Sequence, residues 1–306
     1  MLFSVMLQSR QIEAFRAVMR TGAMTTAADM IHVTQPAVSR LIRDLELELG
    51  FALFHRRGNL VAPTAQAHAL LTEVDRSFIG LGRIRDFADD LRRGQGGTLR
   101  VATLPAMAAG FVPRFAAGFS RDRPRLRMSI DGLPSPVIRD RVVAGQFDIG
   151  MVAVPFQQHG LTVTALDDQA VLALPVGHRL AQKRVVVAED LHDENLILLS
   201  KFAYGLHPVV LALQSVRRGR VIETPLSTIA CAFVSEGLGV AIVDPFSGSD
   251  FIGRGVVLRA FEPSLTVGTA VVHSSDRALS IIATEFRVAF LDHATRFLER
   301  AAYLDF

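Results

Sequence analysis

The chain has 306 residues and 50% of them are hydrophobic, so it is long enough for more than one domain and too apolar to be disordered. Its formal net charge of +3 predicts only modest nonspecific attraction to nucleic acid. Cys231 is the only cysteine, which excludes an intrachain disulfide and a cysteine-based metal cluster; we expect it to be a small buried residue.

The stretch from Thr34 to Glu46 predicts a helix with two different faces. Thr34 can cap the helix, and Pro36 falls within its first turn, where a missing N–H costs nothing. Apolar residues at helical spacing form a stripe for packing: Val38, Leu41, Ile42, Leu45 and Leu49. The opposite face carries polar and basic residues: Gln35, Pro36, Ser39, Arg40 and Arg43.

A short Ala-rich helix is predicted just upstream, from Gly22 to Ile31, with only His32 and Val33 before the next helix. Two short helices around a tight turn make a helix-turn-helix, whose second helix can enter the DNA major groove. There glutamine can pair with adenine, and arginine can read guanine or hold phosphate. The alternative is a helical hairpin whose polar face is only solvated. Thr25, on the first helix, is a further candidate for DNA contact.

Residues 53–63 predict a hairpin with a basic tip, because strand-like ends flank Arg56, Arg57, Gly58 and Asn59. A basic tip beside a recognition helix is a wing, and Arg56 and Arg57 can enter a narrow minor groove or follow phosphates. Taken alone, the same turn could be a solvated loop.

Residues 64–93 predict one long amphipathic helix. Ala67, Val74, Leu81 and Ala88 recur every seven residues, flanked by Leu71, Phe78 and Ile84, as in a coiled-coil seam that Arg85 interrupts. Packing against its own subunit is the alternative to dimerisation. A helix of this length needs a partner to bury its stripe, and a dimer would place two recognition helices on two half-sites.

Gly94-Gln95-Gly96-Gly97 then predicts a domain boundary, after which strands and helices alternate. That alternation predicts parallel sheets covered by helices, in two lobes with a ligand cleft between them at the carboxyl ends of the strands. The expected strands are 98–103, 126–131, 148–154, 171–175, 195–200, 221–224, 240–243 and 268–273, and the expected helices include 110–120, 136–145 and 281–298.

The strand ends supply the candidate effector residues. Helix starts near Ala106 and Ser135 would favour a carboxylate, and Asp244 or strand-end carbonyls could hold an ammonium group. Ser135 and Thr228 could equally be helix caps, and Lys201 a surface lysine. The full set is Thr103, Leu104, Pro105, Ala106, Pro134, Ser135, Val152, Ala153, Ser200, Lys201, Thr224, Thr228 and Asp244.

Residues 10 to about 95 resemble the amino-terminal half of LysR-type transcriptional regulators. The resemblance implies that Gln35, Pro36, Ser39 and Arg40 lie at base edges and nearby backbone, that Arg56 lies in the wing, and that the long helix dimerises. Ala67 departs from the family's usual glycine without touching a DNA-facing position. The matching text is Gln11-Ile12-Glu13-Ala14-Phe15, Thr26-Ala27-Ala28, Thr34-Gln35-Pro36-Ala37-Val38-Ser39-Arg40, Leu45-Glu46, Leu49-Gly50, Leu53-Phe54 and Pro63-Thr64.

The second half resembles the effector domain of the same family, which is similar in fold to periplasmic binding proteins. The resemblance implies an α/β chain with a winged helix-turn-helix amino-terminal domain at 1–66, a dimerising linker helix and hinge at 67–96, and a two-lobed effector domain at 97–306. Lobe I would take about 97–165 and 269–306, and lobe II about 166–268. The matching text is Leu99-Arg100-Val101-Ala102, Phe147-Asp148-Ile149-Gly150, residues 174–180 and residues 234–243.

Within the family, Pro105, Leu198-Leu199-Ser200, Glu223-Thr224 and Cys231-Ala232-Phe233-Val234 resemble the branch that regulates lysine biosynthesis and opine catabolism. That implies an amino acid or amino-acid conjugate as effector, with an aromatic or sugar acid as the alternative. Effector binding would shift the closure of the lobes. The family resemblance further implies promoter DNA as partner and a dimer or tetramer, and it leaves activation and repression both open.

Two other classes fit less well. An enzyme is disfavoured because the nine histidines are scattered and there is no His-Glu-x-x-His, Gly-x-Ser-x-Gly or phosphate-loop spacing; we expect no catalytic residues, metal or cofactor. A solute-binding protein would share the two-lobed half but not the DNA-binding module. Residues 1–8 lack the pattern of a secretory signal, and no run predicts a membrane span, so we expect a cytoplasmic protein starting at Met1 or Met6.

Overall fold

The computed structural model describes residues 7–57, 60–93, 97–200 and 219–302. The chain divides into two compact units, Met1–Asp86 and Phe87–Phe306, each of which is described by itself below. The predicted break at Gly94-Gln95-Gly96 and the candidate residue Lys201 lie outside the described residues.

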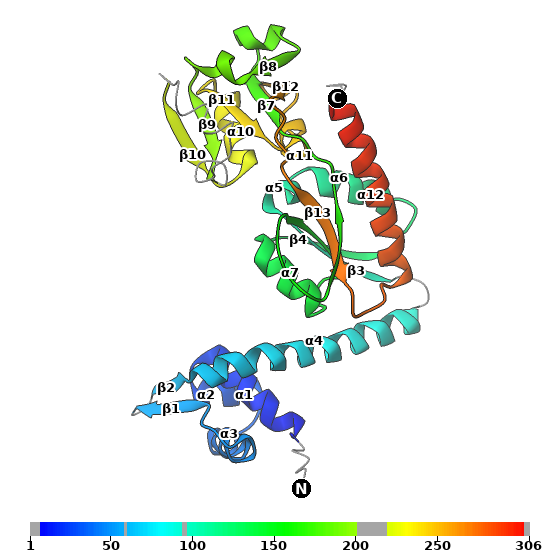
Figure 1. Ribbon diagram of the computed structural model, residues 1–306. Coiled ribbons are helices and arrows are strands. Elements are labelled where there is room, and N and C mark those ends of the chain that lie inside the picture. The colour runs from blue at the N-terminus through cyan, green and yellow to red at the C-terminus, as the bar shows by residue number, and fades with distance from the viewer. Residues whose placement is uncertain (1–6, 58–59, 94–96, 201–218, 303–306) are drawn as a thin grey trace. The chain divides into compact units, whose positions relative to one another are not determined.

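The first unit contains three short helices, a two-stranded hairpin and the start of a long helix (Figure 1). The helices pack on one another around fully buried Phe15, Ile42 and Leu45, and the hairpin strands are antiparallel. This is the winged helix-turn-helix arrangement that the sequence predicts. The elements are α1 (Ser9–Thr21), α2 (Met24–Met30), α3 (Gln35–Leu49), β1 (Phe54–Arg57), β2 (Leu60–Pro63) and α4 (Ala65–Arg93).

The turn between α2 and α3 is short because small residues let the helices approach. Ala27 and Ala28 are buried, the Val33 N–H donates to the Ala28 carbonyl at 3.0 Å, and His32 adopts a positive φ of 55°. Thr34 occupies the N-cap position of α3 as predicted, but its side chain makes no capping hydrogen bond within the described chain. The extended backbone of Thr34 and Pro36 in the first turn therefore define the helix start.

The predicted seam of α4 divides into two parts. Ala67 and Val74 are buried in the core of the first unit, so packing within the subunit accounts for the first turns of the seam. Leu81 and Ile84, further along, are 58% and 66% exposed. These two exposed side chains lie three residues apart, about one helical turn, on the part of α4 that follows the residues buried in the core.

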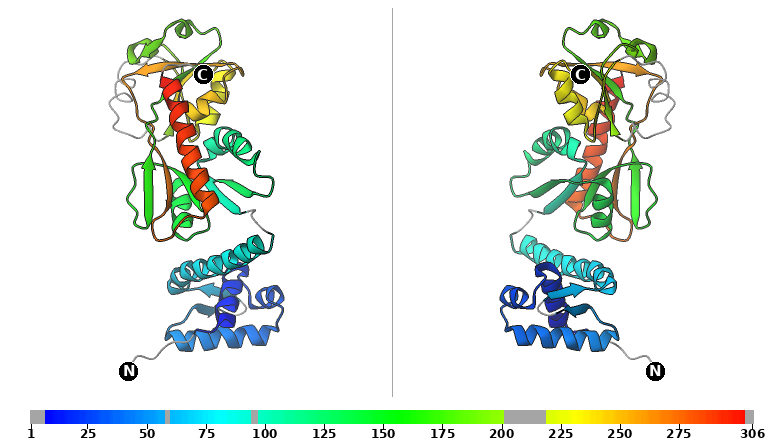
Figure 2. Two further views of the ribbon diagram at one scale, coloured as in Figure 1. Left: turned by 90° about the vertical axis from the view of Figure 1, so that its right-hand side faces the viewer. Right: turned by 90° about the vertical axis from the view of Figure 1, so that its left-hand side faces the viewer.

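The second unit contains two β-sheets with helices around them, and Figure 2 shows it from two further sides. The first sheet and its helices form lobe I. Its strand order is β4-β3-β5-β13-β6. Its strands are β3 (Thr98–Thr103), β4 (Arg127–Gly132), β5 (Ile149–Ala153), β6 (Leu161–Ala165) and β13 (Thr269–Ser274), and its helices are α5 (Pro105–Ala108), α6 (Phe111–Ser120), α7 (Ser135–Val143) and α12 (Ile281–Ala302).

The second sheet forms lobe II, with the strand order β10-β9-β11-β7-β12-β8. Its strands are β7 (Val171–Pro175), β8 (Val185–Val187), β9 (Leu196–Leu199), β10 (Val221–Thr224), β11 (Val240–Val243) and β12 (Val256–Glu262), and its helices are α10 (Ser227–Ser235), α11 (Pro245–Ser249) and the 3-10 turns η1 (Arg179–Gln182) and η2 (Ala188–Leu191).

The sheets are mixed, and this corrects the prediction of parallel sheets. In lobe I, β3 pairs in parallel with β4 and β5, but β13 pairs antiparallel with β5 and β6. In lobe II, β7 pairs antiparallel with β11 and β12. The reason is that the chain passes between the lobes twice. Each crossing enters a sheet beside the carboxyl end of a neighbouring strand, so β7 and β13 run in the opposite direction to β11 and β5.

The two crossings, residues 166–170 and 263–268, form what we call the hinge. The Leu166 N–H donates to the Thr269 carbonyl at 2.8 Å, and the Ala170 N–H donates to the Leu265 carbonyl at 2.7 Å. Between these, the Val267 N–H donates to the Asp168 carbonyl at 2.9 Å. The hinge is therefore a short hydrogen-bonded ladder that belongs to both lobes.

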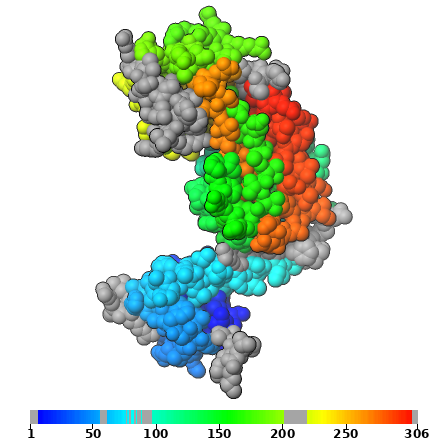
Figure 3. All heavy atoms as spheres, in the orientation of Figure 1, coloured from blue at the N-terminus to red at the C-terminus, as the bar shows by residue number. Residues whose placement is uncertain are grey.

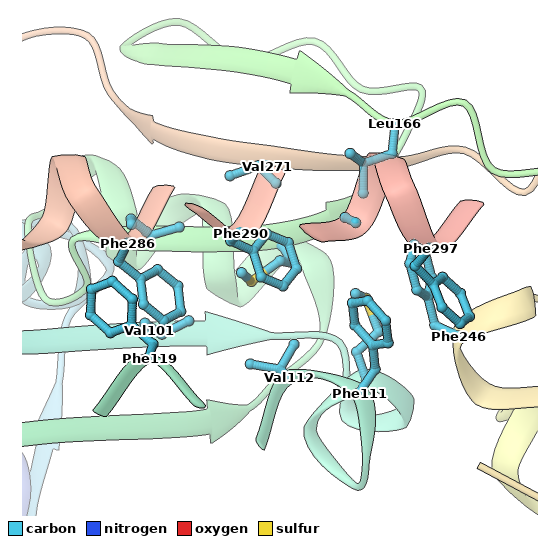
Figure 4. Close-up of a cluster of buried hydrophobic side chains, with 14 of the residues drawn as sticks. Val101, Phe111, Val112, Phe119, Leu166, Phe246, Val271, Phe286, Phe290 and Phe297 are labelled. Carbon is cyan, nitrogen blue, oxygen red and sulfur yellow. The ribbon is translucent and has the colours of Figure 1, made fainter. Parts of the chain in front are cut away.

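A phenylalanine of lobe II completes the core of lobe I. Figure 4 shows Phe246, from α11, beside Phe111 and Phe297. Its ring centroid lies 4.6 Å from that of Phe111 and 5.4 Å from that of Phe297, and the side chain is fully buried. Close to it, Arg114 of α6 forms an ion pair with Asp250, which follows α11. These contacts join the two lobes at a second place besides the hinge.

Candidate functional site

The polar face of α3 is available for contact. Thr34, Gln35, Pro36 and Arg43 are exposed, and the Arg40 side chain is 82% exposed, with its Nε 3.7 Å from Asp44 Oδ2. Gln35 Nε2 donates to Ser39 Oγ at 2.8 Å, so the glutamine and the serine lie side by side on this face. Val38, Ile42 and Leu45 point into the core. The arrangement presents an amide, a hydroxyl and guanidinium groups, which are the donors that read base edges.

Thr25 is exposed on α2, and the predicted Arg56 and Arg57 fall in and at the end of strand β1. A residue that the sequence reasoning did not single out fixes the wing. Glu46 Oε1 accepts hydrogen bonds from the backbone N–H groups of Leu53 at 2.7 Å and Phe54 at 3.1 Å. Because Glu46 is on α3, this helix and the start of the hairpin are directly bonded. The pattern of α3 gave no sign of this role, since Glu46 follows Ser39 by seven residues and so resembles another polar residue on the solvent-facing side.

In lobe I, the predicted effector residues come from neighbouring strand ends. Thr103 ends β3, Leu104 precedes α5, which contains Pro105 and Ala106, and Val152 and Ala153 end β5. The Ala153 N–H donates to Ser135 Oγ at 2.9 Å, which joins the end of β5 to the start of α7. Pro134 occupies the N-cap position of α7 and Ser135 the first helical position, so Ser135 is not the helix cap.

In lobe II, Ser200 follows β9, Thr224 ends β10, and Thr228 lies in the first turn of α10, where Leu226 holds the N-cap position. Thr228 is therefore not a cap either. Asp244 follows β11 and is the N-cap of α11, with its Oδ1 accepting from the Ser247 N–H at 2.7 Å. One oxygen of this carboxylate is thus already engaged in holding the helix.

Three buried hydroxyls have no hydrogen-bond partner within the described residues: Thr103 Oγ1 at the end of β3, Thr224 Oγ1 at the end of β10, and Ser247 Oγ in α11. Buried polar groups are nearly always hydrogen-bonded, to protein, ordered water or ligand, so each of these hydroxyls has capacity for a further partner. Thr103 and Thr224 are both predicted effector residues. Ser247 is not among the predicted residues, although its position three residues after Asp244 could have suggested it.

The hinge contains a buried carboxylate that the sequence reasoning also missed. Asp168 is fully buried, and its Oδ1 accepts from the N–H groups of Gly268 at 3.1 Å and Thr269 at 3.0 Å. Its side chain therefore bonds one crossing to the other. Burial raises the pKa of Asp168, and the hydrogen bonds from Thr269 and Gly268 partly oppose that rise. The sequence gives no periodic signal here, because the crossing is neither strand nor helix.

We expect Asp168→Ala to destabilise the protein by about 1–3 kcal/mol, because it leaves two buried N–H groups without an acceptor. Asp168→Asn keeps an acceptor at Oδ1, so it should lower the free energy of unfolding less than Asp168→Ala does. Since the folded pKa is raised, the folded state binds the proton more tightly, and wild-type stability falls as pH rises from the unfolded value through the folded pKa. Urea unfolding at several pH values between acid and neutral gives the free energies of unfolding. The stability of Asp168→Asn relative to wild type should rise as pH rises. A difference in free energy that does not change with pH would contradict a buried, ionisable carboxylate at this position.

Cys231 is buried in α10, which confirms the prediction that it is a small buried residue. Burial raises the pKa of its thiol to about 12, and the charges of Asp244 and Asp250 add to the effect. We therefore expect the thiol to be protonated and unreactive at neutral pH.

The described residues also give information on metal binding and on membrane insertion. They contain no group of three or more histidine, cysteine, aspartate or glutamate side chains placed to bind a metal ion. In the same residues, none of the helices combines the length and apolar character needed to span a bilayer.

Comparison with known proteins gives two matching family models. Residues 9–68 match the bacterial regulatory helix-turn-helix protein, lysR family, and residues 92–295 match the LysR substrate binding domain. Regulatory protein NocR of Agrobacterium fabrum is 41% identical over 290 residues, which cover 94% of this chain and 97% of NocR. The octopine catabolism/uptake operon regulatory protein OccR of Rhizobium meliloti is 40% identical over 281 residues, covering 92% and 94%.

A solved structure shows the same fold. The crystal structure of full-length CbnR complexed with its target DNA has a TM-score of 0.67 at 21% sequence identity, covering 95% of this chain and 99% of CbnR. The two family models together span the helix-turn-helix unit and the two-lobed unit, and the relatives extend over nearly the whole chain. The chain therefore belongs to the LysR family of bacterial transcriptional regulators, with a DNA-binding domain at its amino end and an effector-binding domain after it.

Proposed function

We propose that this regulator's promoter binding or activation is controlled by an amino acid or amino-acid conjugate bound between lobes I and II. The observation that carries the proposal is the 40% identity to OccR, a regulator named for octopine catabolism and uptake, over 92% of this chain. Octopine is an amino-acid conjugate. The alternative effector is an aromatic or sugar acid.

The strand ends supply chemistry that suits such a ligand. The unpartnered hydroxyls of Thr103 and Thr224 can donate to carboxylate oxygens, and backbone N–H groups at the start of α7 favour the same charge. The second oxygen of Asp244 can accept from an amine, while its first oxygen caps α11. An effector that contacts both lobes favours the closed spacing between them.

We further propose that residues 1–66 bind promoter DNA through Thr25, Thr34, Gln35, Pro36, Ser39, Arg40, Arg43, Arg56 and Arg57. Residues 67–96 would form the dimerising linker, and exposed Leu81 and Ile84 support a second helix packing there. A dimer places two recognition helices on two half-sites, and a tetramer would be a dimer of dimers. Such a regulator acts in the cytoplasm, where its promoter lies.

The test is the thermal unfolding midpoint of the full-length protein against octopine, other opines, free amino acids, and aromatic and sugar acids. A ligand of the folded state raises the midpoint by mass action. We expect a selective rise with an amino-acid-type compound, and a smaller rise in Thr103→Val, which lacks the buried hydroxyl. Thr162→Val, at an exposed position of β6, is the matched control. If the midpoint rose only with an aromatic or sugar acid, the proposed effector class would be wrong, while the assignment as an effector-controlled regulator would still hold.

A further inference from the structure

A cavity of about 710 Å³ lies beside the hinge, and we call it the hinge cavity. Its walls come from both crossings, from the end of β12 in lobe II and from the carboxyl-terminal half of α12 in lobe I. In Figure 3 the red spheres of α12 adjoin green and orange segments of the chain. None of the described residues predicted to bind the effector lines this cavity, so it is distinct from the proposed effector site.

The hinge cavity has apolar walls of the kind that small ligands occupy. Leu166 comes from the first crossing, Phe261 from β12, and Leu291 and Leu298 from α12. A volume of several hundred cubic ångströms with mainly apolar walls and a few polar groups is typical of small-molecule sites.

The charged groups of the hinge cavity all have the same sign. Asp167, Glu262 and Glu299 line it, and the described lining residues include no lysine, arginine or histidine. Asp167 Oδ1 accepts from Gln169 Nε2 at 3.0 Å, whereas neither Glu262 nor Glu299 takes part in an ion pair found in the described chain. All three residues are exposed, so solvent screens their charges, and together they favour a positive charge attached to an apolar body that lies against the buried walls.

We propose that the hinge cavity is a second ligand site, for a small organic cation that combines an ammonium or guanidinium group with an apolar body. The apolar part lies against Leu166, Phe261 and Leu298, and the cationic group pairs with Glu262 or Glu299.

The position of the hinge cavity gives a ligand there a way to act on the effector domain. Lobe I contributes Leu298 and Glu299, and lobe II contributes Phe261 and Glu262, so the size of the cavity depends on how far the lobes close. Asp167 and Gln169 line the cavity while Asp168, between them, bonds the two crossings. A ligand that fits one spacing of the lobes stabilises that spacing.

The experiment is isothermal titration of the full-length protein with phenethylamine, which carries one ammonium group on an apolar body. Phenethyl alcohol and 3-phenylpropionate supply the neutral and anionic counterparts. None of these is an amino acid, and the cation lacks the carboxylate expected of the effector. We expect heat of binding from phenethylamine only, and a Kd about tenfold weaker in the double variant Glu262→Gln, Glu299→Gln.

Two control variants test whether the loss of binding is specific to residues that line the hinge cavity. Glu236→Gln removes an exposed carboxylate that does not line the cavity and should leave the Kd unchanged. Thr295→Trp fills the cavity from α12 and should abolish binding, whereas Thr284→Trp, exposed on the same helix outside the cavity, should not. Absence of binding by phenethylamine, equal binding by the alcohol, or an unchanged Kd in Thr295→Trp would each overturn the proposal. The effector-induced rise in midpoint is measured separately, so failure here leaves the proposed function standing.

Discussion

Arg40→Ala should weaken operator binding about 10- to 100-fold, because a guanidinium that pairs with a base discriminates by about 1–3 kcal/mol. Arg40 is well placed for this role, with a side chain that is 82% exposed on the polar face of α3. Ser39→Ala should weaken binding to a lesser degree, since it removes a hydroxyl that already accepts from Gln35. Effector binding and the unfolding midpoint should not change in either variant. Fluorescence anisotropy with a labelled operator fragment at fixed salt measures the affinity.

The matched control is Arg20→Ala, which removes the same charge from an exposed position at the end of α1. This variant reports the general electrostatic contribution to DNA binding. If Arg40→Ala lost no more affinity than Arg20→Ala, the assignment of α3 as the recognition helix would be wrong.

Phe246→Ala should destabilise the effector domain by about 3–5 kcal/mol, the range for deleting a fully buried phenylalanine. The ring packs against both Phe111 and Phe297, which also contact each other, so its removal leaves a cavity beside them in the core of lobe I. Phe246→Leu retains most of the apolar volume, so its free energy of unfolding should fall clearly less than that of Phe246→Ala. Chemical denaturation followed by circular dichroism gives the free energies of unfolding.

The same variants test whether the lobes are joined at this point. Wild type should show one unfolding transition for both lobes, because a lobe II side chain belongs to the lobe I core. In Phe246→Ala the two lobes should separate into two transitions or become less cooperative. A loss below about 1 kcal/mol would show that Phe246 does not join them.

The sequence predicted the elements whose residues repeat with a regular period. The stripe through Val38, Ile42 and Leu45 identified α3 and both of its faces, and the structure buries these three residues. The strand ends at Thr103 and Thr224 followed from alternation of strands and helices, and both side chains are buried there.

The features that the sequence did not predict depend on contacts between segments that are distant along the chain. The antiparallel β7 and β13 follow from the chain crossing twice between lobes, and no local pattern records the direction of a strand within its sheet. Strands β6, β8 and β12 were not expected, because short runs such as Val185–Val187 look the same as apolar loops. The Asp168 carboxylate accepts a hydrogen bond from the Gly268 N–H, which is distant in sequence, and the Glu46 carboxylate accepts one from the Leu53 N–H, which lies beyond the end of α3. Neither role produces a periodic pattern in the sequence.

The buried thiol of Cys231 has a practical consequence. Because Cys231 is fully buried and its pKa is raised to about 12, we expect it not to react with maleimide or iodoacetamide reagents at neutral pH in the folded protein. It is also the sole cysteine of the chain. A new cysteine placed on each lobe would therefore carry a fluorophore or spin label without background labelling, and opening and closing of the effector domain can be followed in solution in an otherwise natural sequence.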